Sequence, residues 1–349
     1  MGHESRSELI LLNFVLDSDN SLLSHQADVV KALALRFQKV RVITGNVGKF
    51  DCPRNVDIIN LHWVEGNKIR NLLRLFKSFI SVLLPGRKVV FSHMADVQSA
   101  FLSPLTWITR TPHYLWYAHK HLSPYLKFAS YFITGVITST SGSCPLSGQK
   151  ITVIGQGVDP EIFESQRKVS NPLEKSIHIG RADPSKNLKT LFEFARFQYG
   201  SKPNFRLVQV GNPSTITAKV DFENLCKQFE DLIRSGVIEL QSSAPRDRVP
   251  NLLANADLFV HAYEGSLDKT LVEATLARLP VVTLNSEYHE IFGTWSGDVA
   301  PSLESEYQAL KELTDLCREQ EVERRFQIAE ESHSFTRWID KISNILQKS

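Results

Sequence analysis

A buried strand, a polar loop, a helix and a second buried strand follow one another within residues 256–284, and this order is the strongest constraint on the fold. Residues 256–260 and 280–284 are largely apolar runs, as expected of strands covered on both faces of a parallel sheet. Residues 269–277 carry apolar side chains at helical spacing. A strand, a helix and a strand in so short a segment form a parallel crossover, so a layered α/β domain is predicted.

The loop that opens this helix suits a phosphate group. A glycine and a serine precede the first helical turn, where unpaired backbone N–H groups and the helix dipole favour an anion. Glu273 lies one turn into the helix and can accept hydrogen bonds from ribose hydroxyls, while Glu264 and Asp268 flank the loop. A crossover with solvated charges would show the same pattern, so this segment alone leaves both interpretations open. The candidate ligand-binding residues here are Gly265, Ser266, Leu267, Asp268, Lys269, Thr270 and Glu273.

A second group of candidates follows an earlier strand, predicted over residues 176–180. Gly180 ends that strand, and Arg181 and Lys186 stand in the loop before a helix predicted over 187–197. Arginine binds a phosphate as a fork and lysine binds it as a point charge. Two cations at the carboxyl end of a strand can therefore hold the two phosphates of a nucleotide diphosphate, although on their own they would be ordinary solvated charges.

Taken together, these segments resemble glycosyltransferase family 4. The resemblance rests on ordered signposts, dense in the C-terminal half and thin in the N-terminal half: residues 151–159 with Phe163, residues 179–181 with Lys186, Asn187 and Leu191, and residues 264–265 with Glu273, Ala274 and 280–282. The family's usual pair is two glutamates separated by seven residues. Here Gly265 holds the first position and Glu264 lies one residue earlier, so the sugar-contacting role is open between Glu264, Asp268 and the backbone.

The resemblance implies a retaining, metal-independent hexosyltransferase of the bacterial surface-polysaccharide type, with a nucleotide-diphosphate sugar as co-substrate and no other cofactor. It implies the GT-B fold, in which two Rossmann-like, doubly wound parallel-sheet domains face a cleft and a final helix crosses back. We expect an acceptor-side domain over residues 1–160, a donor-binding domain over 161–332 and the returning helix over 333–349.

A histidine is the catalytic candidate in the first half of the chain. Residues 113–120 are predicted to form a strand that runs into a loop, so His119 falls just past a strand's carboxyl end, where open α/β sheets place their ligands. In the resembling family a histidine at a similar position faces the reacting carbon of the donor. His93, after the strand predicted over 88–92, is the alternative. The predicted catalytic residues are His119, Arg181, Lys186 and Glu264.

The charge is divided unevenly along the 349 residues. Residues 1–160 hold 17 Lys and Arg against 10 Asp and Glu, whereas residues 161–349 hold 23 against 28. Residues 68–84 have the pattern of a basic amphipathic helix that is too short and too charged to cross a bilayer. Such a helix can lie on anionic lipid or pack as an ordinary crossover helix whose Ile69, Leu73, Phe76 and Ile80 face the core. No recognisable nucleic-acid module is present, so no nucleic-acid partner is predicted.

The predicted activity is transfer of a sugar to a hydroxyl of a glycan or lipid-linked acceptor. Four scattered cysteines and the polar first ten residues indicate a cytoplasmic protein, which the basic helix would place at the inner face of the cell membrane. Two interpretations from other classes stay open. A nucleotide-sugar epimerase can share the architecture, and a non-catalytic binding protein would fit the displaced first glutamate.

Overall fold

The computed structural model describes residues 8–20, 23–83, 87–148, 150–163 and 173–349, and the chain forms two compact units. Unit 1 comprises Met1–Gly157 and Thr336–Ser349, and unit 2 comprises Val158–Phe335. Val158 donates its N–H to the carbonyl of His333 and accepts from the N–H of Phe335. These two bonds connect Val158 to unit 2. The boundary therefore lies between Gly157 and Val158, whereas the sequence analysis expected it after residue 160.

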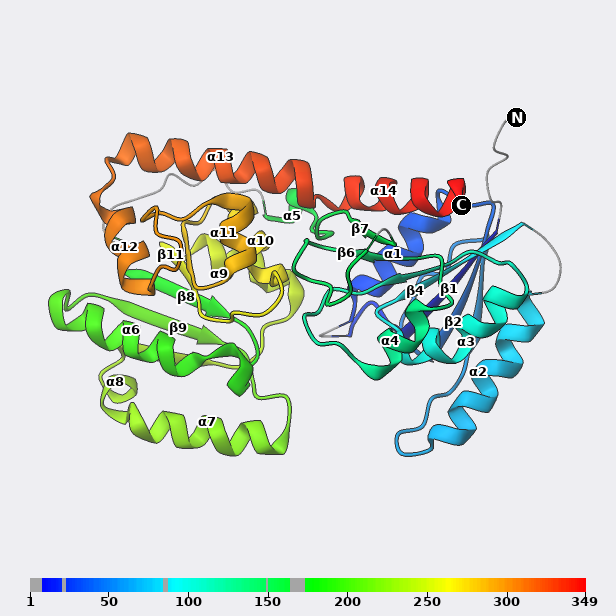
Figure 1. Cartoon of the computed structure of the whole chain (residues 1–349). Coiled ribbons are helices and arrows are strands. Elements are labelled where there is room, and N and C mark those ends of the chain that lie inside the picture. The colour runs from blue at the N-terminus through cyan, green and yellow to red at the C-terminus, as the bar shows by residue number, and fades with distance from the viewer. Residues whose placement is uncertain (1–7, 21–22, 84–86, 149, 164–172) are drawn as a thin grey trace. The chain divides into compact units, whose positions relative to one another are not determined.

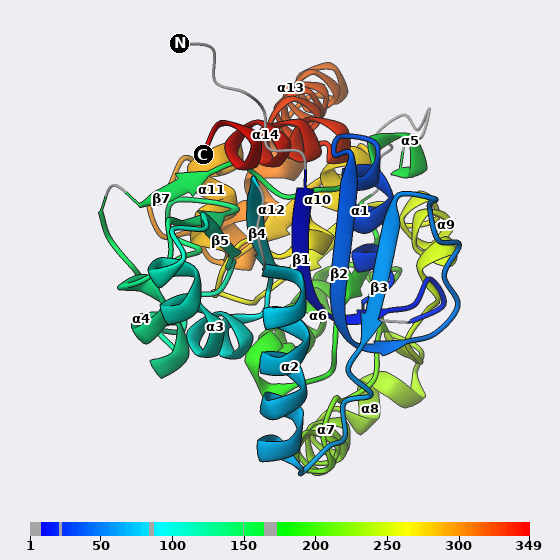
Figure 2. The same cartoon turned by 90° about the vertical axis from the view of Figure 1, so that its right-hand side faces the viewer.

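Unit 1 contains a fully parallel sheet of seven strands in the order β3-β2-β1-β4-β5-β6-β7 (Figure 2). The strands are β1 (Glu8–Leu16), β2 (Lys39–Val47), β3 (Val56–Asn60), β4 (Lys88–His93), β5 (His113–Trp116), β6 (Gly135–Thr138) and β7 (Ile151–Val153). The sequence analysis missed β6. Its four residues pair with β5 on one side and with β7 on the other.

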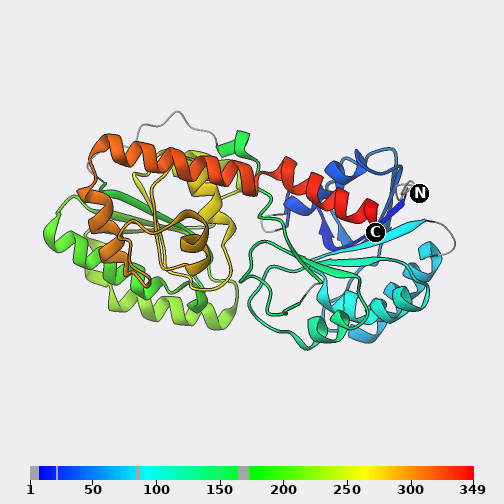
Figure 3. The ribbon, with the colours of Figure 1, turned by 45° about the horizontal axis from the view of Figure 1, so that its top comes forward.

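Helices cover both faces of this sheet. They are α1 (His25–Ala34), α2 (Lys68–Leu83), α3 (Asp96–Ile108), α4 (Pro124–Ser130) and α14 (Phe335–Lys348). Alternate residues of β1, among them Ile10 and Leu12, pack against Leu75 and Phe79 of α2. On the opposite face, Trp338 of α14 contacts Trp116, and Figure 3 shows α14 in red beside α1 in blue. An ion pair joins Arg36, just after the end of α1, to Asp340 in the middle of α14.

Helix α2 ends at Leu83, and the expected last residue, Leu84, lies outside the described residues. Among the described side chains of α2, Asn71, Leu75 and Phe79 are buried. The alternative in which Ile69, Leu73, Phe76 and Ile80 face the core is wrong, because these four side chains are 76%, 63%, 39% and 38% exposed. Across the described residues, no helix combines the length and the apolar character needed to span a bilayer.

Unit 2 is built on a five-stranded parallel sheet in the order β10-β9-β8-β11-β12. Figure 1 labels three of these strands, β8, β9 and β11. The strands of unit 2 are β8 (Lys175–Ile179), β9 (Arg206–Val210), β10 (Ile238–Gln241), β11 (Leu258–His261) and β12 (Val281–Thr283). Its helices are α5 (Pro160–Phe163), α6 (Leu188–Ser201), α7 (Ile216–Gln228), α8 (Glu230–Arg234), α9 (Val249–Ala254), α10 (Lys269–Leu276), α11 (Ser286–Phe292), α12 (Leu303–Glu312) and α13 (Asp315–His333), with the 3-10 turns η1 (Pro184–Lys186) and η2 (Arg246–Arg248). The predicted strand–helix–strand unit is β11, α10 and β12.

Candidate active site

The strand order of unit 2 changes direction between β8 and β11. From β8 the chain adds β9 and β10 on one side, and β11 then pairs with the other side of β8 and continues to β12. Open α/β sheets bind ligands outside the carboxyl ends of their strands at such a point. Two loops meet there, one running from Gly180 to η1 after β8 and the other from Ala262 to α10 after β11.

Lys186 and Asp268 join these two loops. The ammonium group of Lys186 forms an ion pair with Oδ2 of Asp268 and lies 4.1 Å from the centroid of the Tyr263 ring. His261 Nε2 lies 3.4 Å from the same carboxylate oxygen, and His261 Nδ1 lies 3.2 Å from Thr283 Oγ1. Asp268, one of the three alternatives for the sugar contact, therefore directs its carboxylate to Lys186 and His261.

The environment fixes the protonation states of this cluster. Burial by itself raises the pKa of the Asp268 carboxyl, but the hydrogen bond from His261 and the charge of Lys186 outweigh it and hold that pKa well below its usual range. Burial lowers the pKa of His261, against the opposing effect of Asp268. Near neutral pH the cluster thus holds one cation, one anion and a neutral imidazole.

Arg181 and Gly180 stand in the first loop. Half of the Arg181 side chain is exposed, and its Nη1 lies 3.3 Å from Oδ2 of Asp183. Asp183 in turn accepts hydrogen bonds from the N–H and hydroxyl of Ser214 at 2.8 and 2.7 Å. Gly211, at the end of β9, packs on this loop so closely that a Cβ there would lie 2.1 Å from the carbonyl oxygen of Gly180. The close packing of Gly211 against Gly180 therefore fixes the backbone position of Arg181.

Glu273 is 1% exposed on the first turns of α10 and accepts a hydrogen bond of 2.5 Å from Nη2 of Arg246. Arg246 belongs to η2, after β10, and its side chain is 41% exposed. The sequence analysis did not select Arg246. A useful signal was available, because Arg246 follows a strand of the same parallel sheet and its side chain can reach the same carboxyl edge.

Asn285, the N-cap residue of α11, and Glu287 in its first turn hold the second loop, and the sequence analysis missed both. Asn285 Nδ2 donates to the carbonyls of Tyr263 and Gly265 at 3.1 Å each, and Glu287 Oε2 accepts from the N–H of Leu267 at 2.8 Å. Asn285 and Glu287 are buried. The loop before α10 is therefore rigidly positioned by side chains from beyond the next strand.

One buried hydroxyl at this edge is unsatisfied within the described residues. The Thr270 Oγ1 atom, in the first turn of α10, is buried and has no hydrogen-bond partner among the described residues. Ser266 and Leu267 are buried beside it in the chain, Lys269 is half-buried and Glu264 is exposed. The arrangement combines three cations, a helix N-terminus and an unpaired hydroxyl, which together can bind a multiply charged anion.

The two histidine candidates belong to unit 1. His119 is exposed in the loop after β5, with its ring 5.5 Å from the Tyr117 ring. His93, at the end of β4, is buried, stacked on Phe91 and 6.0 Å from the ring of Trp338. His93 is thus part of the packing under α14, whereas the catalytic role of His119 stays a prediction.

Comparisons with known proteins bear on this arrangement. Residues 159–330 match the family model described as glycosyl transferases group 1, a segment that spans most of unit 2. No curated protein sequence matches the chain. The matched segment contains each candidate of the two loops, from Gly180 to Glu273.

Several solved structures share the fold over nearly the whole chain. Alr3699/HepE from Anabaena, solved in complex with UDP, is 16% identical with a TM-score of 0.73, and the match covers 97% of this chain and 99% of that one. A glycosyltransferase from Rickettsia africae is also 16% identical, with a TM-score of 0.68 and coverage of 97% and 98%. WaaG, a glycosyltransferase involved in lipopolysaccharide biosynthesis, is 17% identical, with a TM-score of 0.62 and coverage of 97% and 99%. The chain thus has the GT-B fold, and residues 159–330 are similar to glycosyl transferases group 1.

Proposed function

We propose that the protein is a retaining glycosyltransferase that moves a sugar from a nucleotide-diphosphate donor to a hydroxyl acceptor. The observation that carries the proposal is the gathering of Arg181, Lys186 and Arg246 at the carboxyl edge where the strand order of unit 2 reverses. A related structure contains UDP-glucose, and the same donor chemistry would suit these cations. The base and the sugar of the donor are to be found by experiment.

Each donor-side residue receives a role from its surroundings. Arg181 is exposed enough to bind a phosphate as a fork, and Lys186 adds a point charge held in place by Asp268. The N–H groups and the free hydroxyl of Thr270 at the start of α10 would complete the diphosphate site. Glu273, already oriented by Arg246, would accept hydrogen bonds from the ribose.

The chemical step breaks the bond between the sugar's anomeric carbon and the diphosphate oxygen, and it forms a bond from that carbon to the acceptor oxygen. The acceptor's proton passes to the leaving phosphate, so no carboxylate nucleophile is needed. Lys186, Arg181 and the N-terminus of α10 would stabilise the departing charge. His119 is the residue of unit 1 to which we assign a catalytic role, and Glu264 is retained as a sugar contact.

We propose that the reaction needs no metal ion. The one Asp-x-Asp spacing in the chain, Asp17 to Asp19, lies in unit 1. Asp17 Oδ1 accepts the N–H groups of Asp19 and Lys49 at 3.1 Å each, and the Lys49 ammonium lies 3.2 Å from Asp19. These contacts give Asp17 and Asp19 a structural role in a turn. Undiminished turnover in excess EDTA would support metal independence, and restoration by added Mg²⁺ after a loss would refute it.

The acceptor is proposed to be lipid-linked or part of a surface glycan, reached from the inner face of the cell membrane. Helix α2 leaves four apolar side chains exposed beside Arg70 and Lys77, and it has no acidic residue. A helix of this kind can rest on an anionic bilayer. It would bring unit 1 to an acceptor whose head group stays at the membrane.

A donor panel tests the function. UDP, GDP, ADP and dTDP sugars are incubated with the protein, first alone and then with lipid and glycan extracts, and products are separated by mass spectrometry. We expect one donor to be consumed and its sugar to appear on an extract component with the anomeric configuration kept. An altered free sugar without acceptor would favour the epimerase, and binding without turnover would favour a non-catalytic protein. Either result would overturn the transferase proposal.

A further inference from the structure

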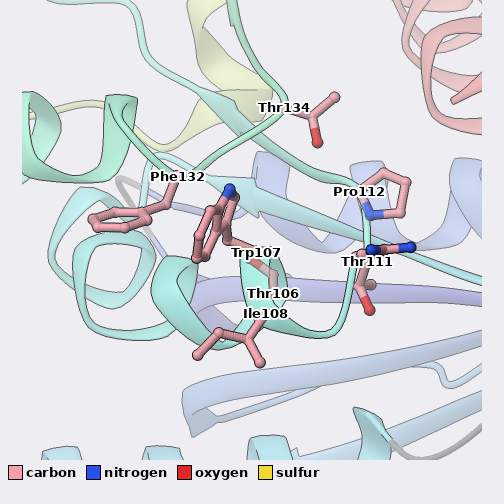
Figure 4. A pocket seen from close by; sticks show the side chains of 8 residues that line it. Thr106, Trp107, Ile108, Thr111, Pro112, Phe132 and Thr134 are labelled. Atoms are coloured by element: carbon pink, nitrogen blue, oxygen red, sulfur yellow. The ribbon is translucent and has the colours of Figure 1, made fainter.

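A cavity of about 590 Å³ opens at the other end of strands β5 and β6, away from His119. It lies where α3 ends and the chain enters β5. Its lining residues are Thr106, Trp107, Ile108, Arg110, Thr111, Pro112, Phe132 and Thr134. Figure 4 shows the indole of Trp107 beside the ring of Phe132, with Ile108 below them.

The walls are mainly aromatic and apolar. Trp107 and Ile108 are 63% and 69% exposed. The Trp107 and Phe132 rings meet edge to face with centroids 6.1 Å apart, and Phe128 of α4 continues the aromatic surface at 5.2 Å from Phe132. Exposed aromatic and aliphatic side chains of this density favour contact with another apolar surface.

Arg110 occupies an unusual backbone position at the mouth of this cavity. Its N–H bonds to the carbonyl of Trp107, and the next N–H, of Thr111, bonds to the carbonyl of Thr106, which closes helix α3 in a Schellman motif. Arg110 is the residue in the left-handed conformation, with φ of 54°, where glycine is usual. A non-glycine residue there carries strain.

Arg278 offers a matched comparison, because it closes α10 in the same motif with the same φ of 54°. The guanidinium of Arg278 is used inside the protein: it donates to Glu323 at 2.8 Å and lies 3.6 Å from the centroid of the Phe326 ring. Within the described part of the chain, the Arg110 guanidinium has no ion pair or hydrogen bond. Within the described residues, no ion pair or hydrogen bond of the Arg110 guanidinium therefore offsets this strain.

The charge of the segment that supplies the lining residues bears on the kind of ligand. From Val97 to Lys150 the sequence holds four Lys or Arg residues and no Asp or Glu. Threonine hydroxyls near the opening are partly engaged: Thr111 bonds to Thr109 at 3.0 Å, and Thr134 accepts the N–H of His113 at 3.0 Å. The lining combines the Arg110 cation with exposed aromatic rings and contains no carboxylate or carboxamide. It therefore suits a phosphate attached to an apolar chain better than it suits a sugar.

We infer that this cavity is a binding site for an anionic phospholipid. The lipid phosphate binds the Arg110 guanidinium, and the glycerol and first acyl carbons lie against Trp107, Ile108 and Phe132. The site supplies an aromatic anchor in addition to the basic helix α2, and two such contacts make a peripheral attachment stable. The inference rests on the membrane part of the proposed function.

The test uses the full chain and a short-chain lipid that stays monomeric, so that the site is measured without a bilayer. Dihexanoyl phosphatidylglycerol is titrated against the protein with tryptophan fluorescence and calorimetry, with dihexanoyl phosphatidylcholine and inorganic phosphate as the comparison ligands. We expect saturable binding of the anionic lipid and a fluorescence change that disappears in Trp107→Phe. Arg110→Gly should weaken binding about tenfold, the effect of losing one charge-assisted hydrogen bond to the phosphate.

Arg110→Gly also separates binding from folding, since glycine relieves the backbone strain and the unfolding midpoint should stay equal or rise. The matched variant Arg278→Gly should leave lipid affinity unchanged and lower the unfolding midpoint. Equal lipid affinity in the wild type and Arg110→Gly would overturn the site, as would inorganic phosphate that displaces the lipid with comparable affinity. Donor turnover in the panel experiment is a separate readout, so failure of the lipid site and failure of the transferase proposal can be told apart.

Discussion

The two units use their charges in opposite ways. At the candidate active site of unit 2, Lys186, Arg246 and Arg181 each have a carboxylate partner, and the carboxylates of Glu273 and Asp268 are largely buried. On α2 and at the end of α3 in unit 1, Arg70, Lys77 and Arg110 have no ion pair within the described residues. Buried pairs hold a fixed geometry and are costly to break, whereas exposed cations act weakly and respond to salt. The first arrangement suits one small ligand, and the second suits a large surface.

The largest expected effect comes from breaking the Lys186–Asp268 pair. Lys186→Ala leaves the Asp268 carboxylate without its cation in a site that is mostly closed to water, so the free energy of unfolding should fall by about 3–5 kcal/mol. Donor turnover should fall at least a hundredfold. Denaturant unfolding and the donor assay measure the two effects.

The double variant Lys186→Met with Asp268→Asn is the control for this prediction. Removing both charges should restore most of the stability but none of the turnover. If the double variant regained turnover, Lys186 would be a structural residue and would not bind the diphosphate.

Two buried histidines, one in each unit, make acid sensitivity the next effect. Burial lowers the pKa of His113 in unit 1 to about 3, and burial followed by the nearby His261 lowers that of His178 in unit 2 to about 3. An unfolded chain protonates each near pH 6.5 while the folded chain does not. Stability is therefore lost as the pH falls from 6.5 towards 3, by about 1.4 kcal/mol per pH unit for each histidine.

Urea unfolding between pH 4.5 and 6.5 measures this slope. His113→Gln should reduce the pH dependence of the free energy of unfolding by the contribution of one histidine, and His178→Gln should reduce it by the same amount. If neither variant changed the slope, these histidines would be protonated already in the folded state. A change in one variant alone would place the acid sensitivity in one unit.

The third effect concerns Glu273 and its partner Arg246. Glu273→Gln keeps the shape of the side chain but removes the charge that the Arg246 guanidinium meets, so stability should fall by about 1–3 kcal/mol. Affinity for the preferred nucleoside diphosphate should drop about tenfold, while affinity for pyrophosphate, which lacks a ribose, should change little. Calorimetry with both ligands checks this, and an equal loss for both would remove Glu273 from the ribose site.

The sequence predicts those helices and strands whose apolar residues recur at regular spacing or that belong to a local motif. Apolar runs and helical spacing indicate β11, α10 and β12 directly, and they place Glu273 on α10. Arg181 and Lys186 lie in the loop after β8, as the sequence analysis expects, and the role of all three residues in binding stays a prediction. Arg246 and Asn285 were missed because single polar residues in loops have no periodicity. Each acts on a partner in another element, and such contacts appear when the sheet brings the carboxyl ends of its strands together.

Exposure was the other property that the sequence could not supply. A helical stripe of apolar residues looks the same whether it meets the core or the solvent. In α2, Leu75 and Phe79 are buried, whereas Ile69 and Leu73 on the same helix are exposed, and this division depends on how the helix is rotated against its sheet.

The smallest effect per residue is expected on this exposed face of α2. Arg74 is a poor choice for a test, because its Nη1 donates to the carbonyls of Leu61 and His62 at 3.1 Å and so holds the helix to unit 1. Arg70→Glu with Lys77→Glu should instead weaken binding to anionic vesicles at low salt, which sedimentation measures. The loss should be roughly 1 kcal/mol for each cation removed, and more because each substitution reverses the charge.

The control is Arg196→Glu with Arg234→Glu, which changes the net charge by the same amount on unit 2 and should have little effect. Binding should fall as salt rises and be absent with neutral lipid. Equal losses in both double variants would mean that the net charge of the protein, and not α2, attracts the vesicles. The exposed cations of unit 1 would then have no special role in binding a surface.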